Sequence, residues 1–159
     1  MDNSDSGRGA WWSMRFEVRD YELDIQGIVN NANYLHYFEH ARHAFIRSRG
    51  LDFAAMHDTG LDAVVFRAEV DWREPLRSGD SFEVQVRARR ESRLKLVFEE
   101  RIVKAAGRES ADGRESAAGR FIVALMQGGR PVPVPEDIAR ALLVDAASNV
   151  VASGPSDQS

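Results

Sequence analysis

One long helical pattern, at residues 33–49, is the feature that most restricts the fold of this chain. Within it the apolar side chains recur at about 100° per residue, so they gather on one face of a helix. The members of this face are Tyr34, Tyr37, Phe38, Ala41, Ala44, Phe45 and Ser48. Gly50 follows as a natural C-terminal cap. A helix of roughly 16 residues is longer than average, and its apolar face needs a large partner elsewhere in the chain.

Nearly all the rest of the chain has strand patterns. Apolar and polar residues alternate at 14–18 and 82–88, which is the period of a half-buried strand. Further strand patterns occupy 63–72, 94–98 and 121–125. Consecutive strands joined by short turns pair antiparallel, and the helix must bury its face on their sheet. The sequence therefore predicts the α+β class, with a curved antiparallel sheet wrapped around one long central helix.

The length of 159 residues indicates one domain. We expect this domain at residues 13–146, between disordered tails at 1–12 and 147–159. The near-repeat GRESADGRESAAGR at 107–120 is predicted to form a hairpin loop. A short C-terminal helix is predicted to begin near Pro135.

Composition excludes several classes of function. The chain has no cysteine, which rules out disulfides, thiolate zinc sites and a cysteine nucleophile. A net charge of −4 gives no electrostatic reason to expect nucleic acid or an anionic membrane as partner. The sequence contains no apolar run of the roughly 18 residues that span a bilayer, and its polar, acidic beginning is unlike a signal peptide. A cytoplasmic protein is the expectation.

The junction before the long helix carries an unusual set of polar residues. Asp24 and Gly27 are followed closely by Asn30, Asn31 and Asn33. A helix N-terminus presents free N–H groups and a partial positive charge, which can stabilise an oxyanion. Asp24 near such an end could serve acyl transfer as general base or as nucleophile. The plainer interpretation, equally open at this point, is a turn with a turn glycine and an asparagine helix cap.

Longer segments around this junction resemble a known family. The strings DIQGIVNNANYL (24–35) and FEHAR (38–42) are similar to the signature of hotdog-fold acyl-CoA thioesterases. Within that group they resemble the 4-hydroxybenzoyl-CoA thioesterase family, which includes the Tol-Pal-associated thioesterases. VDWREP (70–75), SGD (78–80) and PVP (131–133) match later parts of the family pattern in the same order. The resemblance extends over about residues 14–143 and implies a hotdog fold.

The resemblance also implies an activity and its residues. It implies a hydrolase that cleaves acyl-CoA to free acid and CoA, with Asp24 as general base or nucleophile. The backbone amide of Asn31 would stabilise the oxyanion, and Gly27 and Val29 match the motif in the segment that binds substrate. Two positions depart from the common pattern, because residue 30 is asparagine and residue 72 is tryptophan. Because of these two departures, the resemblance does not specify which acyl group the substrate carries.

The family pattern implies no metal or redox cofactor, and a homodimer or homotetramer. Two alternatives to acyl-CoA hydrolysis stay open at this stage. One is a thioesterase for acyl or polyketide chains bound to an acyl carrier protein. The other is a non-catalytic protein that binds acyl thioesters in the same pocket. We expect no nucleic-acid partner and no integral membrane segment.

Three further sets of residues are candidates for binding or catalysis. Arg89, Arg90 and Arg93 form a basic cluster that could contact the phosphates of CoA, although a solvated strand face is the plainer interpretation. The histidines at positions 36, 40 and 43 share one helical stripe, but a third metal ligand is not evident, so no metal is predicted. Glu39 is the second candidate catalytic carboxylate. Arg42 and His43 at i+3 and i+4 favour a structural ion pair for it instead.

Overall fold

The structure of this protein is a computed structural model that describes residues 10–105 and 113–143. Its elements in chain order are β1 (Trp12–Glu17), the 3-10 helix η1 (Asp20–Glu22), α1 (Asn31–Ser48), α2 (Phe53–Asp58), β2 (Leu61–Trp72), β3 (Ser81–Ser92), β4 (Lys95–Lys104), β5 (Glu115–Gln127), β6 (Arg130–Val132) and α3 (Glu136–Leu143). The predicted C-terminal tail and the first part of the predicted loop at 107–120, residues 107–112, lie outside the described residues.

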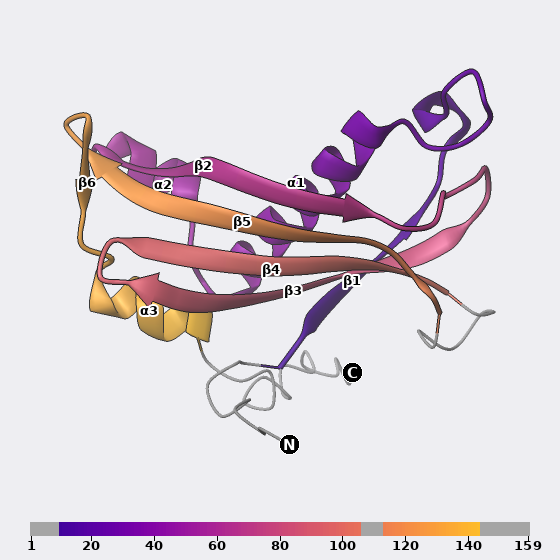
Figure 1. Ribbon diagram of the computed structural model, residues 1–159. Coiled ribbons are helices and arrows are strands. Elements are labelled where there is room, and N and C mark those ends of the chain that lie inside the picture. The colour runs from indigo at the N-terminus through magenta and orange to yellow at the C-terminus, as the bar shows by residue number, and fades with distance from the viewer. Residues whose placement is uncertain (1–9, 106–112, 144–159) are drawn as a thin grey trace, which may run out of the picture.

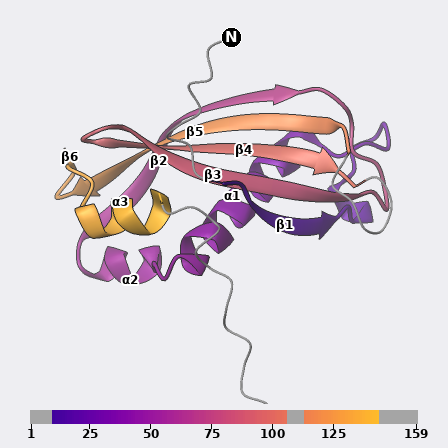
Figure 2. The same ribbon diagram turned by 90° about the horizontal axis from the view of Figure 1, so that it is seen from below.

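The strands form one antiparallel sheet in the order β1-β3-β4-β5-β2, with the short β6 paired to β5. Helix α1 runs along one face of this curved sheet, and α2 and α3 lie near one end of it (Figures 1 and 2). The predicted α+β class and the arrangement of a sheet around one long helix are therefore confirmed. No helix among the described residues is long and apolar enough to cross a membrane.

The apolar face of α1 fills the space beneath the sheet. Five of its predicted members are buried, namely Tyr34, Tyr37, Phe38, Ala41 and Phe45, whereas Ser48 is exposed. Phe38 packs against Phe121 of β5 with ring centroids 5.3 Å apart. Gly119 lies beside this contact, where a Cβ atom would come within 2.6 Å of the Phe121 ring. A glycine there lets α1 approach the sheet closely.

Several details differ from the sequence-based expectations. Trp11 and Trp12, predicted in the N-terminal tail, belong to the folded domain. Trp12 begins β1, and the centre of the Trp11 ring lies 4.3 Å from the guanidinium of Arg87 and 4.4 Å from that of Arg101. Residues 115–120, predicted as loop, form the first half of β5. Leu94, predicted in a strand, is an exposed turn residue. Helix α2 was not predicted.

Candidate active site

A tight turn between η1 and α1 carries Asp24. The backbone N–H of Asp24 donates to the carbonyl of Ile28 at 2.8 Å, and the N–H of Gly27 donates to the carbonyl of Asp24 at 3.0 Å. Gly27 has φ +75°, a conformation that glycine adopts without steric strain. Val29, at the end of the turn, is buried in the core and donates its N–H to the carbonyl of Leu76. The turn is thereby fastened to the body of the domain.

The Asp24 carboxylate is half-buried and only partly engaged. Its Oδ1 atom accepts hydrogen bonds from the N–H of Gln26 at 2.8 Å and from the N–H of Ile28 at 3.4 Å. Its Oδ2 atom bonds none of the described residues. Asp24 is therefore the turn-forming residue of the plainer interpretation, and it still has one carboxylate oxygen available for a proton or a substrate.

The start of α1 leaves one backbone amide free. Asn30 is the N-cap: its side-chain oxygen accepts from the N–H of Ala32 at 2.9 Å, and its carbonyl accepts from the N–H of Asn33 at 2.9 Å. The N–H of Asn31 bonds no described residue, and Asn31 is exposed. A free N–H at the positive end of a helix is a suitable donor to a developing oxyanion. Capping and a free amide thus coexist at this helix end.

Glu22 lies beside this helix end and was not among the predicted site residues. Its backbone carbonyl accepts from the N–H of Asn30 at 3.0 Å and from the side-chain Nδ2 of Asn33 at 2.8 Å. Its carboxylate accepts hydrogen bonds from the Tyr37 hydroxyl and from the N–H of Arg19. Burial raises the pKa of Tyr37, and the hydrogen bond to Glu22 raises it further, so Tyr37 stays a hydroxyl donor.

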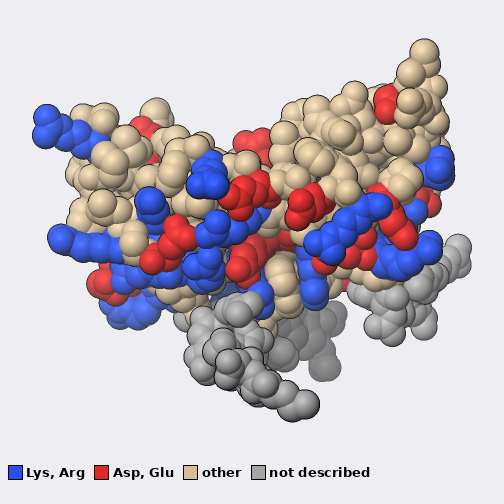
Figure 3. All heavy atoms as spheres, viewed as in Figure 1, with Lys and Arg blue, Asp and Glu red and all other residues tan. Residues whose placement is uncertain are grey.

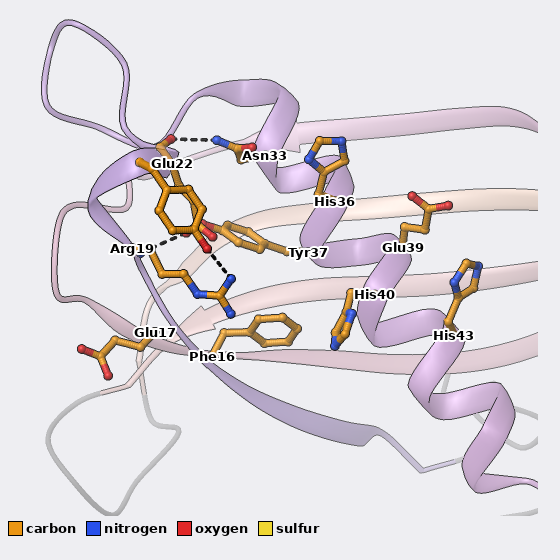
Figure 4. Close-up of a pocket in the computed structure, with 11 residues that line it drawn as sticks. Phe16, Glu17, Arg19, Glu22, Asn33, His36, Tyr37, Glu39, His40 and His43 are labelled. Atoms are coloured by element: carbon orange, nitrogen blue, oxygen red, sulfur yellow. Dashed lines mark hydrogen bonds between the residues drawn. The ribbon is translucent and has the colours of Figure 1, made fainter.

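A cavity of about 520 Å³ lies alongside the first half of α1. Glu22 and Tyr37 lie at its inner end, next to Asn33, and Arg19 and Phe16 border it (Figure 4). Its volume falls within the roughly 300–1,000 Å³ of small-molecule sites. Its lining includes Glu22 but not Asp24.

The predicted histidine stripe lines the outer part of this cavity. The side chains of His36, His40 and His43 project from α1 toward it, together with that of Glu39 (Figure 4). Burial lowers the pKa of His43. Among the described residues, no group of three or more histidine, aspartate or glutamate side chains is arranged to hold a metal ion.

Of the two predicted ion-pair partners of Glu39, Arg42 is wrong, and a pair with His43 stays a prediction. Arg42 turns into the core, where its Nη1 atom lies 2.7 Å from Oε1 of Glu100 on β4. Its guanidinium also stacks 4.5 Å from the centre of the Phe121 ring. Position 42 falls on the buried edge of α1, whereas Glu39 is exposed at the cavity rim. The spacing of i+3 did not decide the pairing, because position 42 lies at the edge of α1 that is buried against the sheet and Glu39 lies on the exposed part of the helix.

The arginine cluster is not brought to the Asp24 turn within one chain. Arg89 and Arg90 lie near the far end of β3, roughly 25–30 Å from its start at about 3.3 Å per residue. Arg89 pairs with Glu99 at 3.3 Å, and Arg90 pairs with Glu136 at 3.0 Å. Basic and acidic side chains alternate across this face of the sheet (Figure 3). Arg93 is exposed on the turn before β4. Contact of these arginines with CoA stays a prediction.

One family model matches most of this chain. A model of the thioesterase-like superfamily matches residues 18–142. The chain belongs to this family. The acyl-acyl carrier protein thioesterase ATL3 of Arabidopsis thaliana is 33% identical over 132 residues, which cover 83% of this chain and 67% of that relative. The acyl-CoA thioester hydrolase YbgC of Escherichia coli is 31% identical over 93 residues, which cover 57% of this chain and 69% of YbgC.

Solved structures of thioesterases share the fold. A thioesterase of Thermus thermophilus, crystallised with coenzyme A and zinc, superposes with a TM-score of 0.67 and 32% sequence identity. The superposition covers 82% of this chain and 90% of the Thermus chain. The resemblance to hotdog thioesterases is thus confirmed. Against two further curated relatives, the match spans 66% and 55% of their length.

Proposed function

We propose that this member of the thioesterase-like superfamily hydrolyses acyl thioesters at the start of α1. The observation that carries the proposal is the free backbone amide of Asn31 at a capped helix N-terminus, close in sequence to a carboxylate with one free oxygen. These are an oxyanion donor and a base or nucleophile, the minimal set for acyl transfer. Family membership supports the same reaction type.

In the proposed reaction the thioester carbonyl oxygen accepts a hydrogen bond from the Asn31 amide. The partial positive charge of the helix end stabilises the negative charge that develops on this oxygen. Asp24 acts in one of two ways. It removes a proton from a water molecule that attacks the carbonyl, or it attacks the carbonyl itself to give an anhydride that water then cleaves. The products are the acid and the thiol in either case, and the reaction needs no cofactor.

The proposed substrate class is acyl-CoA. In support, the named activity of YbgC is on acyl-CoA, and the Thermus thioesterase was crystallised with coenzyme A. An acyl chain on a carrier protein is the second candidate, because ATL3, which shares a longer matched segment, is named for that substrate. A non-catalytic thioester-binding protein is the third candidate.

Thioester hydrolysis by the purified chain tests these candidates directly. Thiol release is measured with octanoyl-, palmitoyl- and benzoyl-CoA and with the same acyl groups on an acyl carrier protein. We expect turnover of at least one acyl-CoA. Turnover confined to the carrier-protein substrates would replace the first candidate by the second. Binding of an acyl thioester without any turnover would contradict the proposed reaction and favour the binding protein.

We further propose that two copies of the chain pair through β2. This twelve-residue strand is an edge of the sheet. It exposes large apolar side chains: Val64 at 43%, Val65 at 41%, Phe66 at 50% and Trp72 at 45%. A long apolar edge strand with free backbone groups is a template for pairing with another strand.

A lysine in this edge is expected to separate the copies. The wild-type chain should have a solution mass of at least twice the chain mass of 17.8 kDa. Val65→Lys should lower it to the mass of the monomer, because a charge replaces apolar surface where the two strands meet. Leu35→Lys is the matched control, since Leu35 is exposed to 41%, as Val65 is, but lies on α1 and outside β2. Sedimentation equilibrium gives the masses of all three proteins. A monomeric wild type would contradict the proposed pairing.

A further inference from the structure

We infer that Glu22 is a positioning residue for thioester hydrolysis, which holds the first turn of α1 so that the Asn31 amide stays aimed at the substrate carbonyl. The inference rests on the proposed function and concerns a residue two positions before Asp24. It is carried by four hydrogen bonds that converge on Glu22 from three parts of the chain.

The first two of these bonds join the peptide of Glu22 to the helix start. One carbonyl oxygen accepts from the N–H of Asn30, the N-cap, and from the Nδ2 of Asn33, the third residue of α1. Asn31 lies between these two donors in the sequence. Because the residues on both sides of Asn31 are tied to one atom, a shift of the Glu22 peptide moves the free amide with it.

The other two bonds keep the Glu22 peptide in place. The Oε2 atom of its carboxylate accepts from the hydroxyl of Tyr37, nearly two turns along α1, and from the N–H of Arg19, which precedes η1. The Glu22 residue is only 8% exposed, and Tyr37 is buried against Phe82. The carboxylate therefore connects the body of α1 to the segment that leads into the Asp24 turn.

The cavity explains why this position takes a carboxylate and not an apolar side chain. Glu22 lines the inner end of the cavity, and its Oε1 atom bonds none of the described residues (Figure 4). A carboxylate with one oxygen held by two protein donors and the other toward a cavity avoids the cost of full burial. Glu22 can thus act as a rigid tie at the edge of a solvent-accessible space.

Three substitutions test the inference. Glu22→Ala removes the tie and is expected to lower kcat by about 10- to 100-fold, because misplacement of a catalytic group by about 1 Å costs up to that much. KM should change little, since the amide acts mainly in the transition state. Tyr37→Phe, which removes one donor, should give a smaller loss of kcat. Glu22→Gln keeps a side-chain oxygen acceptor and should restore most of the activity.

Glu17→Ala is the matched control, because Glu17 also lines the cavity but is exposed. The thermal unfolding midpoint of each variant separates lost catalysis from lost fold. If the wild type hydrolyses thioesters and folded Glu22→Ala keeps its kcat, the inference is overturned while the proposed function stands. If Glu22→Gln is as inactive as Glu22→Ala, and its kcat/KM loses the acidic limb of the pH profile, Glu22 is instead the catalytic base. A wild type without hydrolysis would overturn the proposed function itself.

Discussion

Asp24→Asn is expected to lower kcat/KM for thioester hydrolysis by at least ~10²-fold, the usual contribution of a positioned acid or base. The fold should be retained. Asparagine keeps the side-chain oxygen that accepts from the N–H groups of Gln26 and Ile28, so the turn still closes. The loss then reports on the missing charge and on the weaker base or nucleophile. Steady-state thiol release and the thermal unfolding midpoint, measured on the same preparation, check both parts.

Asp52→Asn is the matched control for this substitution. Asp52 is the N-cap of α2, and its Oδ1 atom accepts from the N–H groups of Ala54 and Ala55 at 2.9 and 3.1 Å. It is thus an amide-bonded aspartate like Asp24, but it lies beyond the other end of α1. Unchanged turnover in Asp52→Asn and lost turnover in Asp24→Asn would assign the effect to the site. Full activity in Asp24→Asn would move the assignment to another carboxylate, with Glu39 as the next candidate.

The helix and most strands could be predicted because their apolar periodicity is local. The pattern at 33–49 differs from α1 by only two residues at its start and one at its end. The first half of β5 could not be predicted in this way. Its residues 115–120 are mostly small or polar, and they form a strand because β4 and β2 pair with them on both sides. Tertiary pairing here overrides weak local propensity.

The site was predictable where a single segment carries it. Asp24, Gly27 and the asparagine cap act within one stretch of about ten residues, so sequence spacing was informative. Glu22 was missed because Tyr37, whose hydroxyl donates to the Glu22 carboxylate, is 15 residues away on another element. The sequence did contain a signal, since Glu22 is an acidic residue two positions before the start of the motif. Only the structure shows that its backbone carbonyl fastens the helix start.

The same limit applies to Arg42. Local spacing suggested Glu39 as its partner, but the true partner, Glu100, is 58 residues away in sequence. Position 42 falls between the apolar face of α1 and its solvent face, and the burial of that edge decides where the side chain goes. Helix spacing alone does not distinguish a surface ion pair from a buried one.

Glu100→Ala is expected to destabilise the fold by about 3–5 kcal/mol, the usual range when one partner of a buried ion pair is removed. The Glu100 side chain has 0% exposure and accepts from Arg42 at 2.7 Å, with Phe121 against the guanidinium. Without the carboxylate, Arg42 remains in the core as an uncompensated charge. Urea unfolding followed by circular dichroism measures the difference above pH 8, where Glu100 is ionised in the folded chain. Replacing both partners, as Arg42→Met with Glu100→Leu, should recover most of the loss because no charge is left buried.

Glu99→Ala is the neighbouring control. Glu99 also forms ion pairs, with Arg87 and Arg89, but on the outer face of the sheet with its side chain 24% exposed, so its loss should cost no more than ~1 kcal/mol.

The pH dependence of the free energy of unfolding gives a second readout for Glu100. Burial raises the pKa of Glu100 from 4.5 to about 8, although Arg42 lowers it. Between these values the folded chain binds a proton that the unfolded chain has lost, so the free energy of unfolding should fall as pH rises. Glu100→Gln should remove that part of the decline. An equal loss in Glu99→Ala and Glu100→Ala would show that burial does not set the strength of this pair.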